Sequence, residues 1–201
     1  MIRRMLGASI IVLALFSSNA MAGLEPQALI QEVAQKTIDR LNAEQELIKK
    51  EPERLYSLIN EFVLPHFDFE RMSKWVLGKH WRRASKQEQQ RFIEEFRTLL
   101  VRTYASSLSD YAQQTIIYLP FHGDLNSGEV MVKSEVEQPG SFGIPINYRL
   151  YKVNSDWKVY DVTIDDISLV SNYRTSFSRE INIKGIDGLI REMAEKNQKS
   201  M

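Results

Sequence analysis

The sequence predicts an α+β fold, in which several helices pack on one face of a curved, mostly antiparallel sheet of about four strands and enclose an apolar cavity. Apolar residues recur at helical spacing from residue 25 to Gln114, and at strand spacing from 115 to 165. Short turn sequences separate the predicted strands, which favours antiparallel pairing between neighbours. The helical period returns at Ser168, directly after the last strand, so this helix is expected to fold back over the sheet.

An export segment is predicted to precede one domain. Residues 1–22 hold Arg3 and Arg4, then an apolar run and a small-residue ending, which is the layout of a secretory signal peptide. Cleavage is expected to leave residues 23–201 as a single soluble domain, because no later segment is apolar and long enough to span a bilayer. The chain has no cysteine, so it forms no disulfide and carries no lipid-anchored cysteine.

The charge balance argues against a nucleic-acid partner. The 26 basic residues equal the 26 acidic ones, and cleavage would remove two arginines. A nearly neutral chain without a basic cluster cannot neutralise many phosphates. Nucleic-acid binding is therefore not expected.

Six helices are predicted, four before the strands and two after them. Ser85 and Glu88 stand at the capping-box spacing and open what is expected to be the longest helix. Gly78 suits a left-handed helix end. The predicted helices cover residues 25 to about 49, 52–64, 67–77, 86–111 and about 186–196, in addition to the one that starts near Ser168.

Four strands are predicted at 115–119, 129–137, 143–152 and 157–165. Pro145 in the third is best tolerated on an edge strand or at a bulge. The fourth alternates strictly, with Lys158, Tyr160, Val162 and Ile164 on one side and Trp157, Val159, Asp161, Thr163 and Asp165 on the other. The pair Asp165 and Asp166 is expected to cap the helix that follows.

Few residues suggest catalytic or metal chemistry. No nucleophile elbow, phosphate-binding glycine loop or metal-binding histidine motif occurs, and His66, His80 and His122 are far apart in the sequence. Asp161 or Asp165 could act as a buried general base, although ion pairing and helix capping are the simpler interpretation. Arg174 could meet a phosphate head group or form a surface ion pair. No metal, cofactor or enzymatic activity is expected.

The chain is rich in large apolar and aromatic residues on both helices and strands. Such residues either fill a core or line a cavity, and periodicity alone does not distinguish the two. The pattern of these residues also resembles the MlaC family of periplasmic phospholipid-binding proteins. The resemblance rests on Phe69 and Met72, Gly78 and Trp81, Phe92 and Phe96, Leu99 to Tyr104, Trp157 to Val162, Ser168 to Phe177, and Gly185 to Ile190.

The resemblance implies a periplasmic carrier of glycerophospholipid that maintains outer-membrane lipid asymmetry. Its implied partners are phospholipid, an outer-membrane lipoprotein–porin complex and an inner-membrane ABC transporter with a hexameric lipid-binding ring. The carrier itself is expected to be a monomer. The bound ligand would be glycerophospholipid rather than a cofactor.

The predicted lipid-binding residues come from helices and sheet together, and the sequence leaves open which face of the sheet is inward. They are Met72, Trp75, Phe92, Phe96, Leu100, Tyr104, Tyr148, Val159, Val162, Leu169, Tyr173 and Phe177. Two other functions stay open at this point. One is an enzyme with a cone-shaped cavity that uses Asp161 or Asp165 as its base, and the other is a periplasmic chaperone for apolar peptides.

Overall fold

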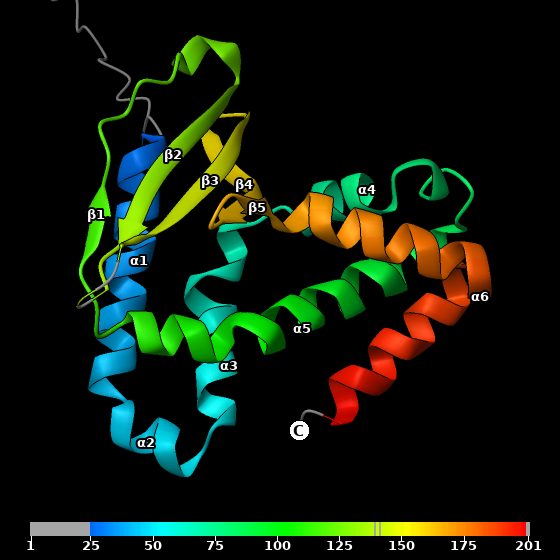
Figure 1. The fold of residues 1–201 in the computed structure, drawn as a ribbon, viewed down its shortest axis with the longest axis horizontal. Helices are drawn as coiled ribbons and strands as arrows, with labels where there is room; N and C mark the ends of the chain where they lie inside the picture. The colour runs from blue at the N-terminus through cyan, green and yellow to red at the C-terminus, as the bar shows by residue number, and fades with distance from the viewer. Residues whose placement is uncertain (1–24, 139, 141, 200–201) are drawn as a thin grey trace, which may run out of the picture.

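The computed structural model describes residues 25–138, 140 and 142–199. The predicted signal peptide lies outside these residues. The helices are α1 (Pro26–Ala43), α2 (Gln45–Lys50), α3 (Glu53–Phe62), α4 (Phe69–Leu77), α5 (Lys86–Tyr111) and α6 (Leu169–Lys199), with short 3-10 helices η1 (Leu64–His66), η2 (Gly78–His80) and η3 (Leu125–Ser127). The strands are β1 (Ile116–Tyr118), β2 (Glu129–Val136), β3 (Ile144–Val153), β4 (Asp156–Ile164) and β5 (Ile167–Ser168), as Figure 1 shows.

The five strands form one antiparallel sheet in the order β1-β2-β3-β4-β5. This confirms the predicted α+β class; the strand beyond the expected four is the two-residue β5, which forms a hairpin with β4. Pro145 is the second residue of β3, which pairs with both β2 and β4. The prediction that it lies on an edge or at a bulge is therefore wrong, because the start of an interior strand also accepts it.

A bulge in β4 overturns the predicted strict alternation. Arg149 pairs with Asp161 and Leu150 with Val159, so the register skips Tyr160. The skipped residue puts Val159 and Val162 on the same face, which is the inner one, while Tyr160 joins a different core on the other side. Side-chain period two holds only where the ladder is regular, and one extra residue reverses it.

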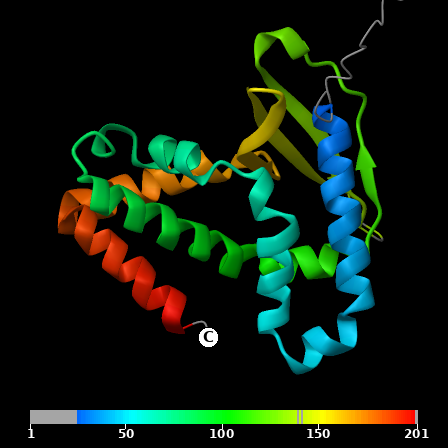
Figure 2. The ribbon, with the colours of Figure 1, turned by 180° about the vertical axis from the view of Figure 1, so that it is seen from behind.

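The helices form two groups around the sheet. α1 lies along the inner face of the sheet, and the C-terminal half of α5 closes the space beside it, as the opposite views in Figures 1 and 2 both show. α4 and the start of α6 contact β4 instead, so helices cover part of both sheet faces rather than one face alone. The rest of α4, α5 and α6 extends away from the sheet as a helical layer.

Polar and aromatic contacts hold α4 against the outer side of the sheet. The Arg71 guanidinium lies over the rings of Tyr151 and Tyr160, at 3.8 and 4.7 Å from their centroids, and pairs with Glu129. Asp68 caps α4 by accepting a hydrogen bond from the Arg71 backbone N–H at 2.8 Å, and it also accepts one from the Tyr151 hydroxyl. The segment that leads into α4 is thus fixed to β3 and β4.

The predicted N-terminal cap is observed at α5 but not at α6. The capping box of Ser85 and Glu88 is present, and α5 is the longest helix without a break. The predicted capping of α6 by Asp165 and Asp166 is wrong, because both have positive φ, 48° and 61°, in the β4–β5 turn. Instead, Ser168 accepts a hydrogen bond from the N–H of Ser171 at 3.1 Å.

Gly185 divides α6 into two segments. Its φ of 75° and ψ of 171° interrupt the helix, and the second segment returns beside α5 (Figure 1). There the Asn197 amide donates to the Glu95 carbonyl at 3.0 Å. The predicted helix from Ile186 corresponds to this second segment. The predicted helix of residues 25 to 49 is likewise divided, into α1 and α2 at Glu44.

Candidate functional site

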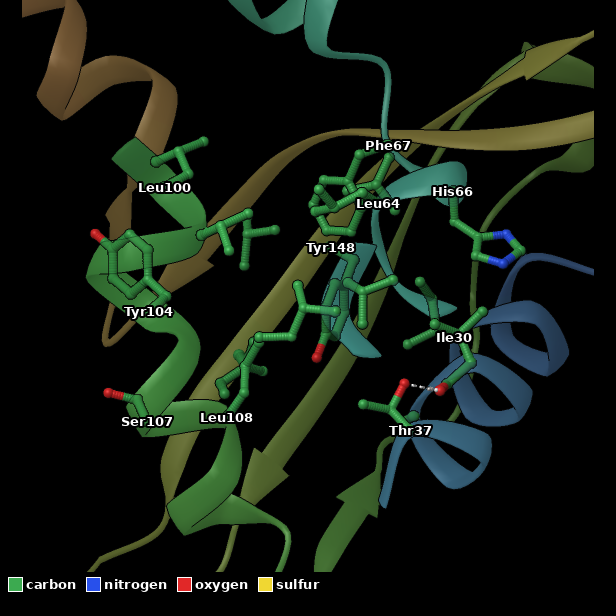
Figure 3. Close-up of a pocket in the computed structure, with 18 of the residues that line it drawn as sticks. Ile30, Thr37, Leu64, His66, Phe67, Leu100, Tyr104, Ser107, Leu108 and Tyr148 are labelled. Carbon is green, nitrogen blue, oxygen red and sulfur yellow. Dashed lines mark hydrogen bonds between the residues drawn. The ribbon is translucent and has the colours of Figure 1, made fainter. Parts of the chain in front are cut away.

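An apolar pocket of about 280 Å³ lies between the inner face of the sheet and the helices α1, α3 and α5. Figure 3 shows α1 and α5 on opposite sides, with Tyr148 from the sheet and Phe67 beyond η1 between them. Most of its lining is aliphatic. α1 contributes Ile30, Val33, Ala34, Ile38 and Leu41, and the sheet contributes Ile116, Val136, Ile146, Tyr148, Val159, Val162 and Ile164.

Polar side chains in the lining are few and mostly hydroxyls. Thr37, Tyr104, Ser107 and Tyr148 carry the hydroxyl groups, and His66 carries the single imidazole. The Thr37 hydroxyl is already satisfied, because it donates to the Val33 carbonyl at 2.7 Å. Among the residues that the structure describes, no carboxylate, lysine or arginine lines this pocket.

The two tyrosines are uncharged at physiological pH. Burial, with a smaller contribution from Tyr118, raises the pKa of Tyr148 to about 12. Burial and the neighbouring Tyr173 raise the pKa of Tyr104 to about 12 as well. Tyr148 keeps some accessible surface although protein surrounds it, because that surface faces the pocket. The pocket can therefore bind apolar groups and offers hydroxyls, but not fixed charge, along its walls.

Seven of the twelve predicted site residues line this pocket. They are Met72, Leu100, Tyr104, Tyr148, Val159, Val162 and Leu169. They come from five elements, α4, α5, β3, β4 and α6. The bulge in β4 brings Val159 and Val162 together in the lining.

The other five predicted residues lie outside the lining. Phe92, Phe96, Tyr173 and Phe177 pack against one another between α5 and α6, with ring centroids 5.2 to 6.0 Å apart. Trp75 is 44% exposed and contacts Tyr160 on the outer side of β4. The aromatic residues of this group that belong to α5 have the same helical spacing as the lining residues on α5. One face of α5 contacts α6 near the start of α5 and the pocket near the end of α5.

The sequence reasoning missed the contribution of α1 and of the segment from Leu64 to Phe69. The apolar stripe of α1 was visible as an amphipathic pattern, and its small members Ala34 and Thr37 leave space rather than fill it. His66 gave no periodic signal, because η1 is only three residues long. Phe67 was placed in the predicted helix of residues 67–77, which begins at Phe69 instead.

The carboxylates proposed as general bases are outside the pocket. Asp161 is buried, and it accepts hydrogen bonds from the Ser168 hydroxyl at 2.7 Å and from the Val170 N–H at 3.2 Å. It thus holds the start of α6, as the simpler interpretation expected. Asp165 is exposed in the β4–β5 turn.

The structure also separates the remaining polar candidates. His80 is buried near Ser178 and His122 is exposed, so neither joins His66. No group of three potential metal-binding side chains is found within the described residues. Arg174 lies beside Gly78, at the end of α4 and away from the pocket. Among all the residues that the structure describes, no helix is long and apolar enough to cross a bilayer.

Comparison with known proteins gives consistent matches. The chain is 28% identical over 185 residues to the intermembrane phospholipid transport system binding protein MlaC of Haemophilus influenzae, covering 90% of this chain and 86% of that protein. It is 26% identical over 196 residues to a toluene tolerance protein of Pseudomonas putida, covering 94% and 91%. A phospholipid-binding protein from Ralstonia solanacearum, solved in complex with a phospholipid, has a TM-score of 0.81 and 28% identity, over 88% of this chain and 99% of that one.

The profile of one protein family matches most of the chain. Residues 31–195 match the profile described as MlaC protein. The match runs from the first helix to the last, so it includes each element that lines the pocket. The chain therefore belongs to the MlaC family.

Proposed function

We propose that this protein is a periplasmic carrier that holds the acyl chains of a glycerophospholipid in the pocket between α1, α5 and the sheet. The observation that carries this proposal is the composition of the pocket, which is apolar on every side and lies in a fold shared with a protein solved with bound phospholipid. A pocket with so few polar groups suits a ligand that is itself mostly hydrocarbon.

The energetics of lipid transfer explain why such a pocket is needed. Two acyl chains contain about thirty methylenes, and exposing them to water costs roughly 0.8 kcal/mol each, or on the order of 25 kcal/mol. A phospholipid therefore cannot cross an aqueous gap alone at a useful rate. A carrier has to cover the tails, whereas the head group can remain in contact with water.

The proposed lipid contacts differ in part from those expected from the sequence. They include the seven predicted residues that line the pocket, and also the α1 stripe from Ile30 to Leu41 and the segment from Leu64 to Phe69. The aromatic residues between α5 and α6 are assigned to the structural core instead. They hold the two helices together without contacting the pocket.

Membership of the family supports a cellular role for the carrier. It would exchange lipid, as a monomer, with an outer-membrane lipoprotein–porin complex and with an inner-membrane ABC transporter that has a hexameric lipid-binding ring, and so maintain outer-membrane lipid asymmetry. Export by the segment 1–22 would place it in the periplasm. Intact-mass measurement of periplasmic protein should give a chain that begins at Gly23; a mass that includes residues 1–22 would contradict export with cleavage.

Lipid extraction and transfer test the carrier function directly. Mass spectrometry of an organic-solvent extract of the purified protein should detect stoichiometric phospholipid. The protein should also accelerate the movement of labelled phospholipid from donor to acceptor vesicles. Protein without lipid that protects apolar peptides from aggregation would favour the chaperone alternative, and turnover of a small apolar substrate would favour an enzyme.

A further inference from the structure

His66 is distinct among the residues of the apolar pocket. Within the described residues it is the one lining side chain that can change its charge near neutral pH. It belongs to η1 and is half-buried, and Figure 3 shows its imidazole at the margin of the lining, on the side that faces α1. A single ionisable group at the margin of an apolar pocket is placed where the polar end of an amphiphile would lie.

Lys158 adds positive charge to the same wall. Its ammonium donates a hydrogen bond to the carbonyl of Pro65, the residue before His66, at 2.6 Å. One bond leaves two of the three ammonium protons available. No carboxylate lies within ion-pair distance of Lys158 in the described part of the chain.

The segment from Leu64 to Phe69 separates two unlike spaces. The apolar pocket lies on one side, and on the other is a second hollow whose walls include the polar side chains Lys158, Arg97 and Asp68. Leu64, Phe67 and Phe69 contact both spaces. This wall therefore meets hydrocarbon on one surface and charge on the other.

The electrostatic surroundings of His66 favour an anion. Burial lowers the pKa of His66, and Lys158 lowers it further; Glu32 on α1 raises it and Lys36 on α1 lowers it. Glu32 and Lys36 pair with each other, so they largely cancel. A positive field that opposes protonation of the imidazole attracts a phosphate for the same reason.

We propose that His66 binds the phosphate of the phospholipid, which places the head group at the η1 wall and the tails between α1, α5 and the sheet. The imidazole N–H would donate to a phosphate oxygen, and Lys158, bonded to the Pro65 carbonyl from the other side of the segment, would add to the positive field there. The assignment rests on the proposed carrier function and deepens it, since it specifies how the lipid is oriented in the pocket. It also gives the site a preference for lipids that carry a phosphate diester.

A pH dependence follows from this geometry. A bound phosphate stabilises the protonated imidazole, so the affinity for a phosphate-bearing lipid should increase as the pH falls below the ordinary imidazole value of about 6.5. A lipid with the same tails and no phosphate should show no such increase. The charged groups that act on His66 from the neighbouring elements are Lys158, Lys36 and Glu32.

The test compares two lipids that share their acyl chains. Delipidated full-length mature protein is incubated with dioleoylphosphatidylglycerol or with dioleoylglycerol, and the retained lipid is measured at about pH 8 and about pH 5.5, on either side of the imidazole pKa. The ratio of the two lipids is the readout, because a misfolded variant would lose both. The wild type should prefer phosphatidylglycerol, and more strongly at the lower pH.

Two variants test the proposed site and two matched variants serve as controls. His66→Leu should reduce the preference roughly tenfold, as expected for one charge-assisted hydrogen bond, and should also abolish the pH dependence. Lys158→Met should reduce the preference to a smaller extent, because its charge acts from the other side of the segment. His122→Leu and Lys133→Met change exposed residues and should retain the wild-type ratio. If His66→Leu does not fold, Lys158→Met still tests the proposal.

Several outcomes would overturn the proposal. Equal retention of both lipids by the wild type, or an unchanged ratio in both site variants, would show that the phosphate lies elsewhere while the carrier function stands. Loss of the phosphatidylglycerol preference on adding inorganic phosphate or glycerophosphoglycerol would show a site for free phosphate rather than for a lipid head group. If the wild type retains no phospholipid at all, the carrier function itself is contradicted.

Discussion

Val162 and Phe96 are both buried, but the structure gives them different roles. Val162 is 7% exposed and lines the pocket, whereas Phe96 is fully buried among Phe92, Tyr173 and Phe177. Val162→Asp should yield folded protein with much less co-purified lipid, because a charge among acyl chains is unfavourable. The measurement is lipid per folded protein, and Ile183→Asp, at a position that is 74% exposed, is the matched control. Unchanged lipid content in Val162→Asp would contradict the assigned lining.

Phe96→Asp should instead prevent stable folding. Loss of a buried phenyl ring costs about 3–5 kcal/mol, which is a large part of the stability of a domain, and the new carboxylate adds to this loss. Circular dichroism and thermal denaturation would detect the effect. A well-folded Phe96→Asp protein that has lost only its lipid would show that Phe96 lines the binding site after all.

The lowered pKa of His80 predicts that the protein loses stability in mild acid. Burial is the main cause that lowers its pKa, with Lys79 and Arg83 adding to the effect. Because the folded protein then binds this proton less readily than the unfolded chain, the stability is complete above the ordinary pKa of about 6.5 and decreases as the pH falls toward the lower folded value. His80→Gln should reduce the difference in melting temperature between neutral and mildly acidic buffer. The exposed His122→Gln should leave it unchanged, and equal acid sensitivity in all three proteins would contradict a role for His80.

At the level of elements, Gly185 determines the path of the C-terminus. Its φ of 75° with ψ of 171° is a conformation that residues with a side chain rarely adopt, although nothing lies within 4 Å of the position of an added Cβ. Gly185→Ala should therefore destabilise the protein by about 1–3 kcal/mol through backbone strain alone. Thermal denaturation should show a decrease of roughly 2–4 °C per kcal/mol. Ile183→Ala, two residues earlier and exposed, should have little effect; equal melting temperatures for both variants would mean that the bend tolerates a side chain.

The β4 bulge shows where element-level prediction reaches its limit. The residue range of β4 was predicted within one residue at each end, because turn residues mark both ends. The orientation of its side chains was wrong after Tyr160, since a bulge depends on pairing with β3 and leaves no periodic signal of its own. The pocket depends on this irregularity, because it turns Val159 and Val162 toward the same space.

At the level of the whole molecule, the pocket links lipid binding to stability. A cavity of about 280 Å³, at about 24 cal/mol per Å³, corresponds to about 7 kcal/mol, which is comparable to the total stability of a domain. The lipid-free protein is therefore expected to close α1 and α5 toward the sheet, and to be more compact but less stable than the loaded form.

Thermal denaturation and small-angle scattering of stripped and loaded protein test this expectation. A lipid present at a thousand times its Kd should stabilise the fold by about 4 kcal/mol, or a melting temperature increase of roughly 8–16 °C. Hydrogen exchange in α1 and in the end of α5 should slow in the loaded form. Identical radius, exchange and melting temperature after complete lipid removal would show a rigid pocket.

The sequence by itself determined the order and type of the elements, the capping box of α5 and the apolar character of the chain, because all of these depend on residues close together along the chain. It could not separate the aromatic cluster between α5 and α6 from the pocket lining, since both use the same helical spacing. Only the tertiary structure decided that Val159 and Val162 share a face, that α1 forms a wall of the pocket and that His66 lies at the margin of the pocket. These features depend on which segments meet in space, and contacts between distant segments leave no local period in the sequence.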